Sequence, residues 1–126
     1  MKTPQQIVTE ATKAADEAGS AWMKSKLDEG VPGIITVVDG FTGRPVGRML
    51  DLCGNAHLEI KDKRSKVYKE FKKAGLIDEH GRATVTINHR YVARQEHGLH
   101  LACINAAKEI FIQNGITNVA IWSYID

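Results

Sequence analysis

The clearest pattern in the sequence lies at its C-terminal end, where residues 92–126 read VARQEHGLHLACINAAKEIFIQNGITNVAIWSYID. Apolar side chains recur there at three- and four-residue intervals, which predicts an amphipathic helix from about Val92 to Asn114. Gly115 follows as a helix stop. Branched and aromatic residues then predict a closing strand over residues 118–124. The predicted apolar stripe of the helix consists of Leu99, Cys103, Ala106, Ala107 and Ile110.

The N-terminal end carries a second long helical pattern. Thr3 and Pro4 are typical of a helix start, because a Thr side chain accepts a hydrogen bond from a free backbone N–H and Pro is tolerated in the first turn. The pattern runs to about Leu27 and ends before Gly30. Its many alanines predict close packing against a flat surface such as a sheet. The predicted apolar stripe contains Ile7, Ala11, Ala14, Ala18 and Trp22.

Strand patterns and a short helical pattern lie between these two helices. The first three strand patterns predict a hairpin and then an antiparallel meander. The order α-β-β-β-α-β-α-β favours a single α+β domain over residues 1–126, with a mostly antiparallel sheet and helices packed on one face. The predicted strands cover residues 34–38, 46–52, 56–60 and 83–87, and the helical spacing covers residues 63–74.

Composition is that of an ordinary soluble domain. The 126 residues are 43% hydrophobic and 25% charged, which excludes disordered, collagen-like, coiled-coil and membrane classes. The formal net charge of +2 is too small to indicate nucleic-acid binding by itself. The first residues do not resemble a signal peptide, and no apolar run is long enough for a membrane span. We therefore expect a cytoplasmic protein, with no membrane partner and with Cys53 and Cys103 reduced and not bonded to each other.

Positive charge is concentrated around the predicted helix over residues 63–74. Lys66, Lys69 and Lys73 fall on one face of that helix, and such a row can follow a phosphate backbone. The alternative is the solvated face of an ordinary amphipathic helix, because Asp62 and Glu70 interrupt the row. The candidate nucleic-acid-binding residues are Lys63, Arg64, Lys66, Lys69, Lys72 and Lys73.

The sequence contains none of the common catalytic or nucleotide-binding motifs that we searched for. The sequence has no phosphate-binding glycine loop, no dinucleotide-binding fingerprint and no nucleophile elbow. The remaining candidates for a catalytic role are Asp51, Glu96 and His100. Glu96 lies near the start of the last helix, where a carboxylate commonly caps the free N–H groups. The functional alternative places it at the rim of a pocket, with Asp51 or Arg94 nearby.

No metal site and no cofactor are predicted. His97, His100 and Cys103 follow one another at three-residue intervals on the last helix. Around the helix axis, however, Cys103 falls in the middle of the apolar stripe, His100 at its edge and His97 outside it, so the three cannot surround one ion. We therefore expect a buried thiol and two half-exposed histidines.

Several segments of the chain resemble a family of small uncharacterised proteins encoded by bacteriophages. The resemblance covers about the last two-thirds of the chain, and residues 80–90 depart from it. It implies a phage-encoded protein acting in the host cytoplasm, and it implies no activity. The segments that carry it are GRMLDLCGNA at 47–56, FKKAGL at 71–76, RQE at 94–96, NGI at 114–116 and SYID at 123–126.

The sequence favours a small non-enzymatic phage accessory protein that binds a macromolecule, either nucleic acid or a host protein. One alternative is a small enzyme that acts on nucleotides or nucleic acid. The other is a self-associating structural protein whose C-terminal strand, residues 118–124, pairs with a second copy. The three readings require different surfaces: a continuous positive strip, acids converging in a concave pocket, or a large apolar self-contact.

Overall fold

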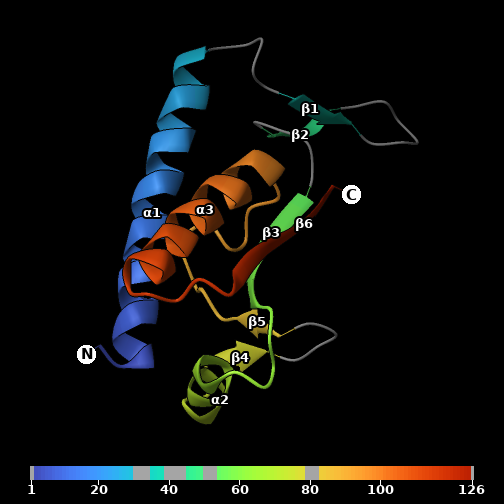
Figure 1. Ribbon diagram of the computed structural model, residues 1–126. Helices are drawn as coiled ribbons and strands as arrows, with labels where there is room; N and C mark the ends of the chain where they lie inside the picture. Colours follow the sequence, from blue (N-terminus) through green and yellow to red (C-terminus); the bar gives the residue numbers. More distant parts are fainter. Residues whose placement is uncertain (1, 30–34, 39–44, 50–53, 79–82, 126) are drawn as a thin grey trace.

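A computed structural model of the protein describes residues 2–29, 35–38, 45–49, 54–78 and 83–125 (Figure 1). The protein is a single α+β domain with antiparallel strand pairs and helices on one face of its main sheet, as the sequence predicts. Asp51 and Cys53 lie outside the described residues. The elements in chain order are α1 (Pro4–Glu29), β1 (Ile35–Val38), β2 (Pro45–Met49), β3 (Gly54–Ile60), α2 (Lys66–Lys73), β4 (Ile77–Asp78), β5 (Thr84–Val85), α3 (His97–Gln113) and β6 (Val119–Ile125).

The main sheet has four strands in the order β4-β5-β3-β6. The predicted meander of the first three strands is wrong, because among the described strands β1 and β2 pair with each other in a two-stranded sheet and β3 pairs with neither. β3 pairs instead with β6 along its whole length, from Gly54 opposite Ile125 to Ile60 opposite Val119. Neighbours in the sequence favoured a pairing of β2 with β3. The C-terminal strand is the partner of β3 instead, and the pairing extends over the full length of both strands.

The helices form two successive layers over the sheet. α3 lies against β3 and β6, and α1 packs on the far side of α3, so that α3 is enclosed between α1 and the strands (Figure 1). The alanine-rich face of α1 therefore meets a helix, where the sequence led us to expect a sheet. No helix of the described residues is long and apolar enough to cross a membrane.

The contact between α1 and α3 uses the smallest side chains of α1. Its buried positions recur at four-residue intervals, and Ala14, Ala18 and Trp22 of the predicted stripe are only half-buried. At Gly19 an added Cβ would lie 2.5 Å from Cδ2 of Tyr91 and 2.8 Å from Sγ of Cys103. Such distances are far inside van der Waals contact, so only glycine allows this approach. The buried row is Ile7, Ala11, Ala15 and Gly19.

α3 begins five residues later than its sequence pattern predicts, at His97 instead of about Val92. The preceding residues are held by α1: Asp16 Oδ1 accepts a hydrogen bond from the Arg90 backbone N–H at 2.6 Å. The hydroxyls of Ser20 and Tyr91 lie 2.8 Å apart and share a second bond. These tertiary contacts keep the segment before α3 in a turn. The buried residues of α3 are Leu99, His100, Cys103, Ile104, Ala107 and Phe111, whereas Ala106 and Ile110 are half-buried.

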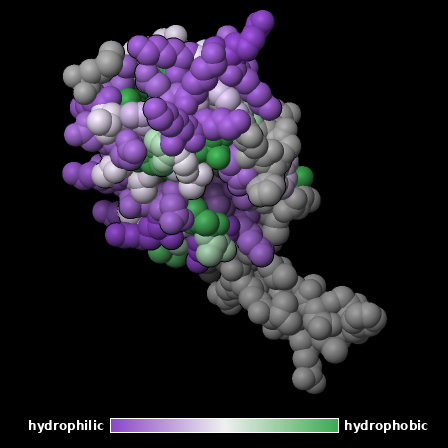
Figure 2. Space-filling view, turned by 90° about the horizontal axis from the view of Figure 1, so that it is seen from below, coloured by the Kyte–Doolittle hydropathy of each residue, from purple (hydrophilic) through white to green (hydrophobic). Residues whose placement is uncertain are grey.

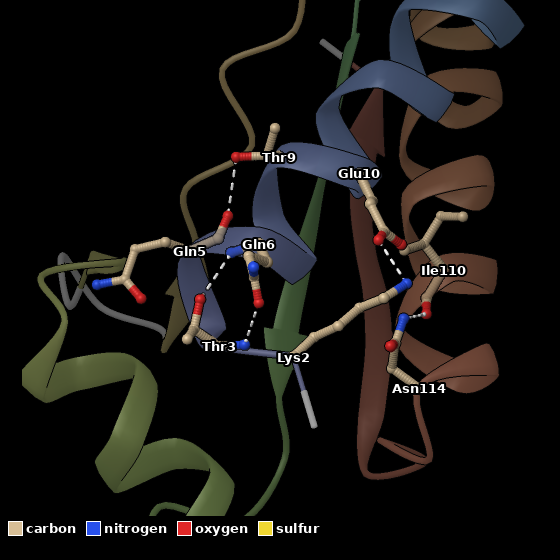
Figure 3. Close-up of polar contacts among 8 residues, drawn as sticks. All are labelled: Lys2, Thr3, Gln5, Gln6, Thr9, Glu10, Ile110 and Asn114. Atoms are coloured by element: carbon tan, nitrogen blue, oxygen red, sulfur yellow. Dashed lines mark hydrogen bonds and ion pairs between the residues drawn. The ribbon is translucent and has the colours of Figure 1, made fainter.

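Local capping fixes the helix ends. At the start of α1, Thr3 Oγ1 accepts from the Gln6 N–H at 3.2 Å while the Thr3 N–H donates to Gln6 Oε1 at 2.8 Å (Figure 3). This reciprocal pair is a capping box, and it confirms Thr3 as the predicted cap. At the end of α3, Asn114 Nδ2 donates to the Ile110 carbonyl at 2.7 Å, and Gly115 adopts a φ of +80°. Gly115 thus ends the helix as predicted.

We expect Gly19→Ala to destabilise the protein. Alanine at a helix interior usually gains about 1 kcal/mol over glycine, but overpacking a core costs about 1–3 kcal/mol. Because the new methyl group would meet Tyr91 and the fully buried Cys103, the cost should exceed the gain. Urea unfolding measures the balance.

Ser25→Ala, at an exposed position of the same helix, is the matched control and should leave stability unchanged or slightly raised. A Gly19→Ala protein as stable as the Ser25→Ala protein would contradict the close contact between α1 and α3.

Candidate functional site

The six candidate basic residues all lie on the surface of α2 or of the turn before it. Every one of them is exposed, whereas Tyr68 and Phe71 of the same helix are buried. Phe71 packs against Phe111 of α3 with ring centroids 5.5 Å apart. The helix therefore has one face packed against the core and an opposite face of exposed basic side chains. Figure 2 views the molecule from below, the end at which α2 lies in Figure 1, and that end is largely hydrophilic.

The acidic residues near α2 hold these cations only loosely. Lys66 Nζ lies 3.8 Å from Glu70 Oε1, and Arg64 Nε lies 3.7 Å from Asp62 Oδ1. Both pairs are long and solvent-exposed, and such pairs contribute about 0–1 kcal/mol. The backbone beneath them is firmly placed, because Ser65 caps α2 by accepting from the Tyr68 N–H at 3.1 Å. A capped helix therefore presents basic side chains to solvent.

Glu96 does not cap α3, although it occupies the N-cap position. Its side chain makes no capping hydrogen bond, and the residue is only 2% exposed. Both carboxylate oxygens instead accept from Arg94 Nε at 3.1 Å, and Arg94 Nη2 contacts Oε2 even more closely. The hydrogen bond to Glu96 is the main cause of the raised pKa of Arg94. The expected neighbour Arg94 is confirmed, and the expected capping role is wrong because a stronger bidentate partner was available.

His100 is buried, with 1% of its surface exposed, which corrects the expectation of a half-exposed ring. Its Nε2 lies 2.6 Å from the Arg94 carbonyl oxygen, to which it donates a proton. The side chain packs between α3 and the segment before it. The periodicity of the helix does not predict this contact, because it does not show where the preceding segment lies. His97 is half-buried, and among the described residues its buried Nε2 has no hydrogen-bond partner.

A cleft of about 270 Å³ lies beside β3 and brings together three histidines from distant parts of the chain. His57 comes from β3, His89 from the segment after β5, and His100 from α3. The rings of His89 and His100 meet edge to face, with centroids 5.6 Å apart. The sequence analysis missed His57 and His89, because no spacing pattern links them to His100. The other polar residues lining the cleft are Asn55, Asp78, Thr84, Thr86 and Asn88.

Burial keeps two of these histidines neutral. It is the largest cause of the lowered pKa of His57 and of His89, and repulsion from His100 lowers both further. Asp78 and Asp16 act in the opposite direction on His57 and His89 respectively. Imidazoles, amides and hydroxyls line the cleft, so it suits a ligand with hydrogen-bonding edges.

Metal binding has no support in the described part of the chain. Within it, no group of three or more His, Cys, Asp or Glu side chains is arranged to hold a metal ion. Cys103 is a free thiol with no exposed surface. Burial, and secondarily the charge of Asp16, raise its pKa to about 11, so it is unsuited to act as a nucleophile at neutral pH.

A second depression, of about 350 Å³, lies at the start of α1, where the lining side chains take part in structural contacts of the helix. Its walls are side chains that already bond one another: the capping box of Thr3 and Gln6 lies beside the ion pair of Lys2 and Glu10 (Figure 3). Thr9 donates its hydroxyl proton to the Gln5 carbonyl at 2.8 Å. These contacts involve Lys2, Gln6, Thr9 and Glu10 of the lining.

The C-terminal strand β6 occupies an edge of the main sheet, as the sequence led us to expect for residues 118–124. Among the described strands, none pairs with its outer edge. Its residues, VAIWSYI, carry no charge. On the sheet face turned away from α3, Trp122 and Tyr124 of β6 lie beside His57 of β3.

Comparisons with known proteins do not assign the chain to a family. No family model matches the chain, and neither a curated protein nor a solved structure does. Function has to be argued from the surfaces described above, since a fold class alone does not imply an activity.

We expect the protein to lose stability between pH 7.5 and pH 5, with His89 as one cause. Its folded-state pKa is lowered, so the unfolded chain takes up the proton first, near pH 6.5. The contribution is complete above that pH and is lost as the pH falls below it, by at most about 1.4 kcal/mol per pH unit. Urea unfolding at several pH values measures this slope.

His89→Gln should flatten the slope over this range, whatever its effect on stability at pH 7.5. Lys13→Gln, an exposed substitution on α1, is the control and should leave the slope unchanged. A wild-type stability that does not change from pH 7.5 to pH 5 would contradict the burial of neutral histidines.

Proposed function

We propose that the protein binds nucleic acid, with the basic face of α2 contacting the phosphate backbone. The observation that carries the proposal is the exposure of all six basic residues on α2 and the turn before it, while the opposite face of α2 is anchored in the core. Anchoring matters because a phosphate-binding surface gains affinity when the backbone beneath it does not need to be ordered on binding. The six are Lys63, Arg64, Lys66, Lys69, Lys72 and Lys73.

The distribution of charge supports this proposal more than its total. A formal net charge of +2 over the whole chain attracts a polyanion weakly. The concentration of cations at the α2 end produces a local positive field, and phosphate neutralisation there releases condensed counterions. Contacts of this kind position a nucleic acid without reading its sequence. A non-enzymatic role as a phage accessory protein, acting in the cytoplasm of the host, belongs to the same proposal.

An enzymatic role is less well supported by the geometry. Glu96 is held by Arg94 in a bidentate pair and is not part of the cleft wall, whereas His100 is. The two described candidates therefore do not converge on one concave site, which acid–base catalysis would require.

We expect the triple variant Lys66→Gln/Lys69→Gln/Lys73→Gln to fold normally and to bind every nucleic-acid sequence more weakly. All three side chains are exposed, so their loss should leave stability within about 0.5 kcal/mol. The logarithm of wild-type affinity should fall with that of salt concentration, with a slope of about −0.7 to −0.9 per contacted phosphate. The variant should show a shallower slope. Fluorescence anisotropy with labelled oligonucleotides measures both.

The matched control compares two double variants. Lys69→Gln/Lys73→Gln should weaken binding, and Lys13→Gln/Lys24→Gln, which removes the same charge from exposed positions of α1, should not. Equal losses in the two would assign the effect to net charge and contradict a specific role for α2. Wild-type protein that binds no nucleic acid at low salt would overturn the proposal and favour an acidic protein partner.

A second candidate function is self-association through β6. The observation that favours it is the unpaired outer edge of an uncharged strand within the described sheet, since such edges readily pair with another chain. Analytical ultracentrifugation should then show a dimer, and Ser123→Lys, a charge placed at an exposed position of that edge, should yield monomers. A monomeric wild-type protein at high concentration would rule this candidate out.

A further inference from the structure

The two faces of the main sheet differ sharply in what covers them. Side chains of β3 alternate between buried and half-buried positions, and the buried ones face α3. His57 belongs to the other set and lies directly opposite Trp122 of β6, while Asn55 lies opposite Tyr124. Side chains of paired residues point to the same face of a sheet, so all four lie on the face turned away from the helices.

Three rings on that face form a continuous group, called here the aromatic face: His57, Trp122 and Tyr124. The centroids of His57 and Trp122 lie 5.3 Å apart with an interplanar angle of 24°, and those of Trp122 and Tyr124 lie 5.2 Å apart. His57 and Tyr124 are stacked at 6.3 Å. Tyr124 is 39% exposed, and Trp122 and His57 are partly exposed. Aromatic rings that remain partly exposed to water are not fully stabilised by burial. A group of three such rings on an accessible sheet face therefore indicates a ligand-binding surface.

We propose that the aromatic face is a stacking surface for the unpaired bases of a single-stranded nucleic acid. This inference rests on the nucleic-acid binding proposed above and deepens it by naming the class of ligand. Bases of a single strand can be splayed out and stacked on aromatic side chains, whereas those of a duplex are already stacked on one another. A flat sheet face also cannot enter the groove of a duplex in the way a helix does.

The aromatic face and the basic residues lie on one connected piece of structure. The turn before α2 is joined to the start of β6, because the Lys61 N–H donates to the Asn118 carbonyl at 2.9 Å and Asn118 Nδ2 donates to Ser65 Oγ at 3.3 Å. Trp122 lies four residues further along β6, about 13 Å at the usual rise of a strand. A strand whose bases stack on the aromatic face therefore has exposed cations within reach of its phosphates, which is the charge complementarity that such a ligand requires.

Acidic groups on the same face indicate the path of the strand. Glu59 and Asp78 belong to the outer set, because Glu59 is paired with Thr84 and Thr84 with Asp78. Their charges would repel phosphates from the β4–β5 side of the sheet. The partner of Glu59 on β6 is Ala120, which is uncharged. The phosphate backbone should therefore follow β6 and leave the β4–β5 side free.

The cleft adjoins the aromatic face through residues that belong to both. His57 and Asn55 line the cleft, and His57 also stacks on Trp122. A volume of about 270 Å³ is slightly below the roughly 300–1,000 Å³ of typical small-molecule sites, so the cleft is too small for a length of strand but suits the edge of one base. Asn55, Asn88 and the imidazoles supply donors and acceptors for such an edge.

Tryptophan fluorescence tests stacking directly, because the chain has only two tryptophans, Trp22 and Trp122. In Trp22→Phe protein the signal comes from Trp122 alone, and we expect it to be quenched on addition of an oligo(dT) or oligo(U) single strand. Duplex DNA of equal length should not quench it. In Trp122→Phe protein, where Trp22 on α1 is the sole reporter, the single strand should cause no quenching.

Substitution of Tyr124, the most exposed ring of the aromatic face, gives a second readout that leaves the Trp122 side chain in place. Tyr124→Ser should weaken single-strand binding about 5- to 100-fold, the loss expected for one base–aromatic stack. Ile125→Ser, at a neighbouring and still more exposed position whose side chain points to the opposite face, is the matched control and should bind as the wild type does. Circular dichroism checks that each variant folds.

The outcomes separate this inference from the function on which it rests. Quenching of Trp122 by single strands only, together with a loss specific to Tyr124→Ser, supports stacking. Equal binding of single strands and duplexes that depends on the lysines, without quenching, overturns stacking and leaves nucleic-acid binding in place. Equal losses in Tyr124→Ser and Ile125→Ser also overturn stacking, because the strand as a whole would then matter. No binding at low salt overturns both proposals.

Discussion

The close approach of α1 and α3 at Gly19 is the constraint on which the rest of the structure depends. A side chain there would collide with Tyr91 and Cys103, so the two helices meet only because this position has none. The same contact lets Asp16 and Ser20 hold the segment around Tyr91 in a turn. That turn ends where α3 begins, and α3 in turn covers the sheet. One missing methyl group thus sets the position of the central helix.

Polar groups in the core then fix the cleft. The pair of Arg94 and Glu96, and the bond from His100 to the Arg94 carbonyl, hold the start of α3 against the preceding segment. Buried polar groups must be satisfied, so these contacts favour a single arrangement of the chain at this point. His89 and His100 are consequently part of a rigid wall. The basic surface proposed to bind a ligand is the exposed face of α2, whose opposite face is anchored in the core, so little ordering is needed on binding.

The two proposed binding surfaces differ in chemistry: the exposed face of α2 is basic, and the outer face of β3 and β6 is aromatic. In the proposed function, the exposed cations of α2 would attract a polyanion through charge alone. The aromatic face consists of ring side chains without a cation, and in the proposal it would select unpaired bases through contact between flat surfaces. The outer edge of β6 is a third and separate feature, because it offers backbone groups to a partner strand, whereas the aromatic face offers side chains. The proposed ligand binding and the proposed self-association would thus use different atoms of the same strand.

The sequence by itself determined the elements whose signals are local. Thr3 starts α1 through its own side chain, Gly115 ends α3 through its backbone, and the spacing of Lys66, Lys69 and Lys73 places them in solvent because apolar residues of α2 require the other face. Only the tertiary structure decided the partner of β3, the late start of α3 and the burial of His100. Each of these depends on residues far apart in the chain: β6 competing with β2, Asp16 holding Arg90, and the Arg94 carbonyl accepting from His100. Periodicity reports which face of an element is apolar, and it contains no information about what that face will meet.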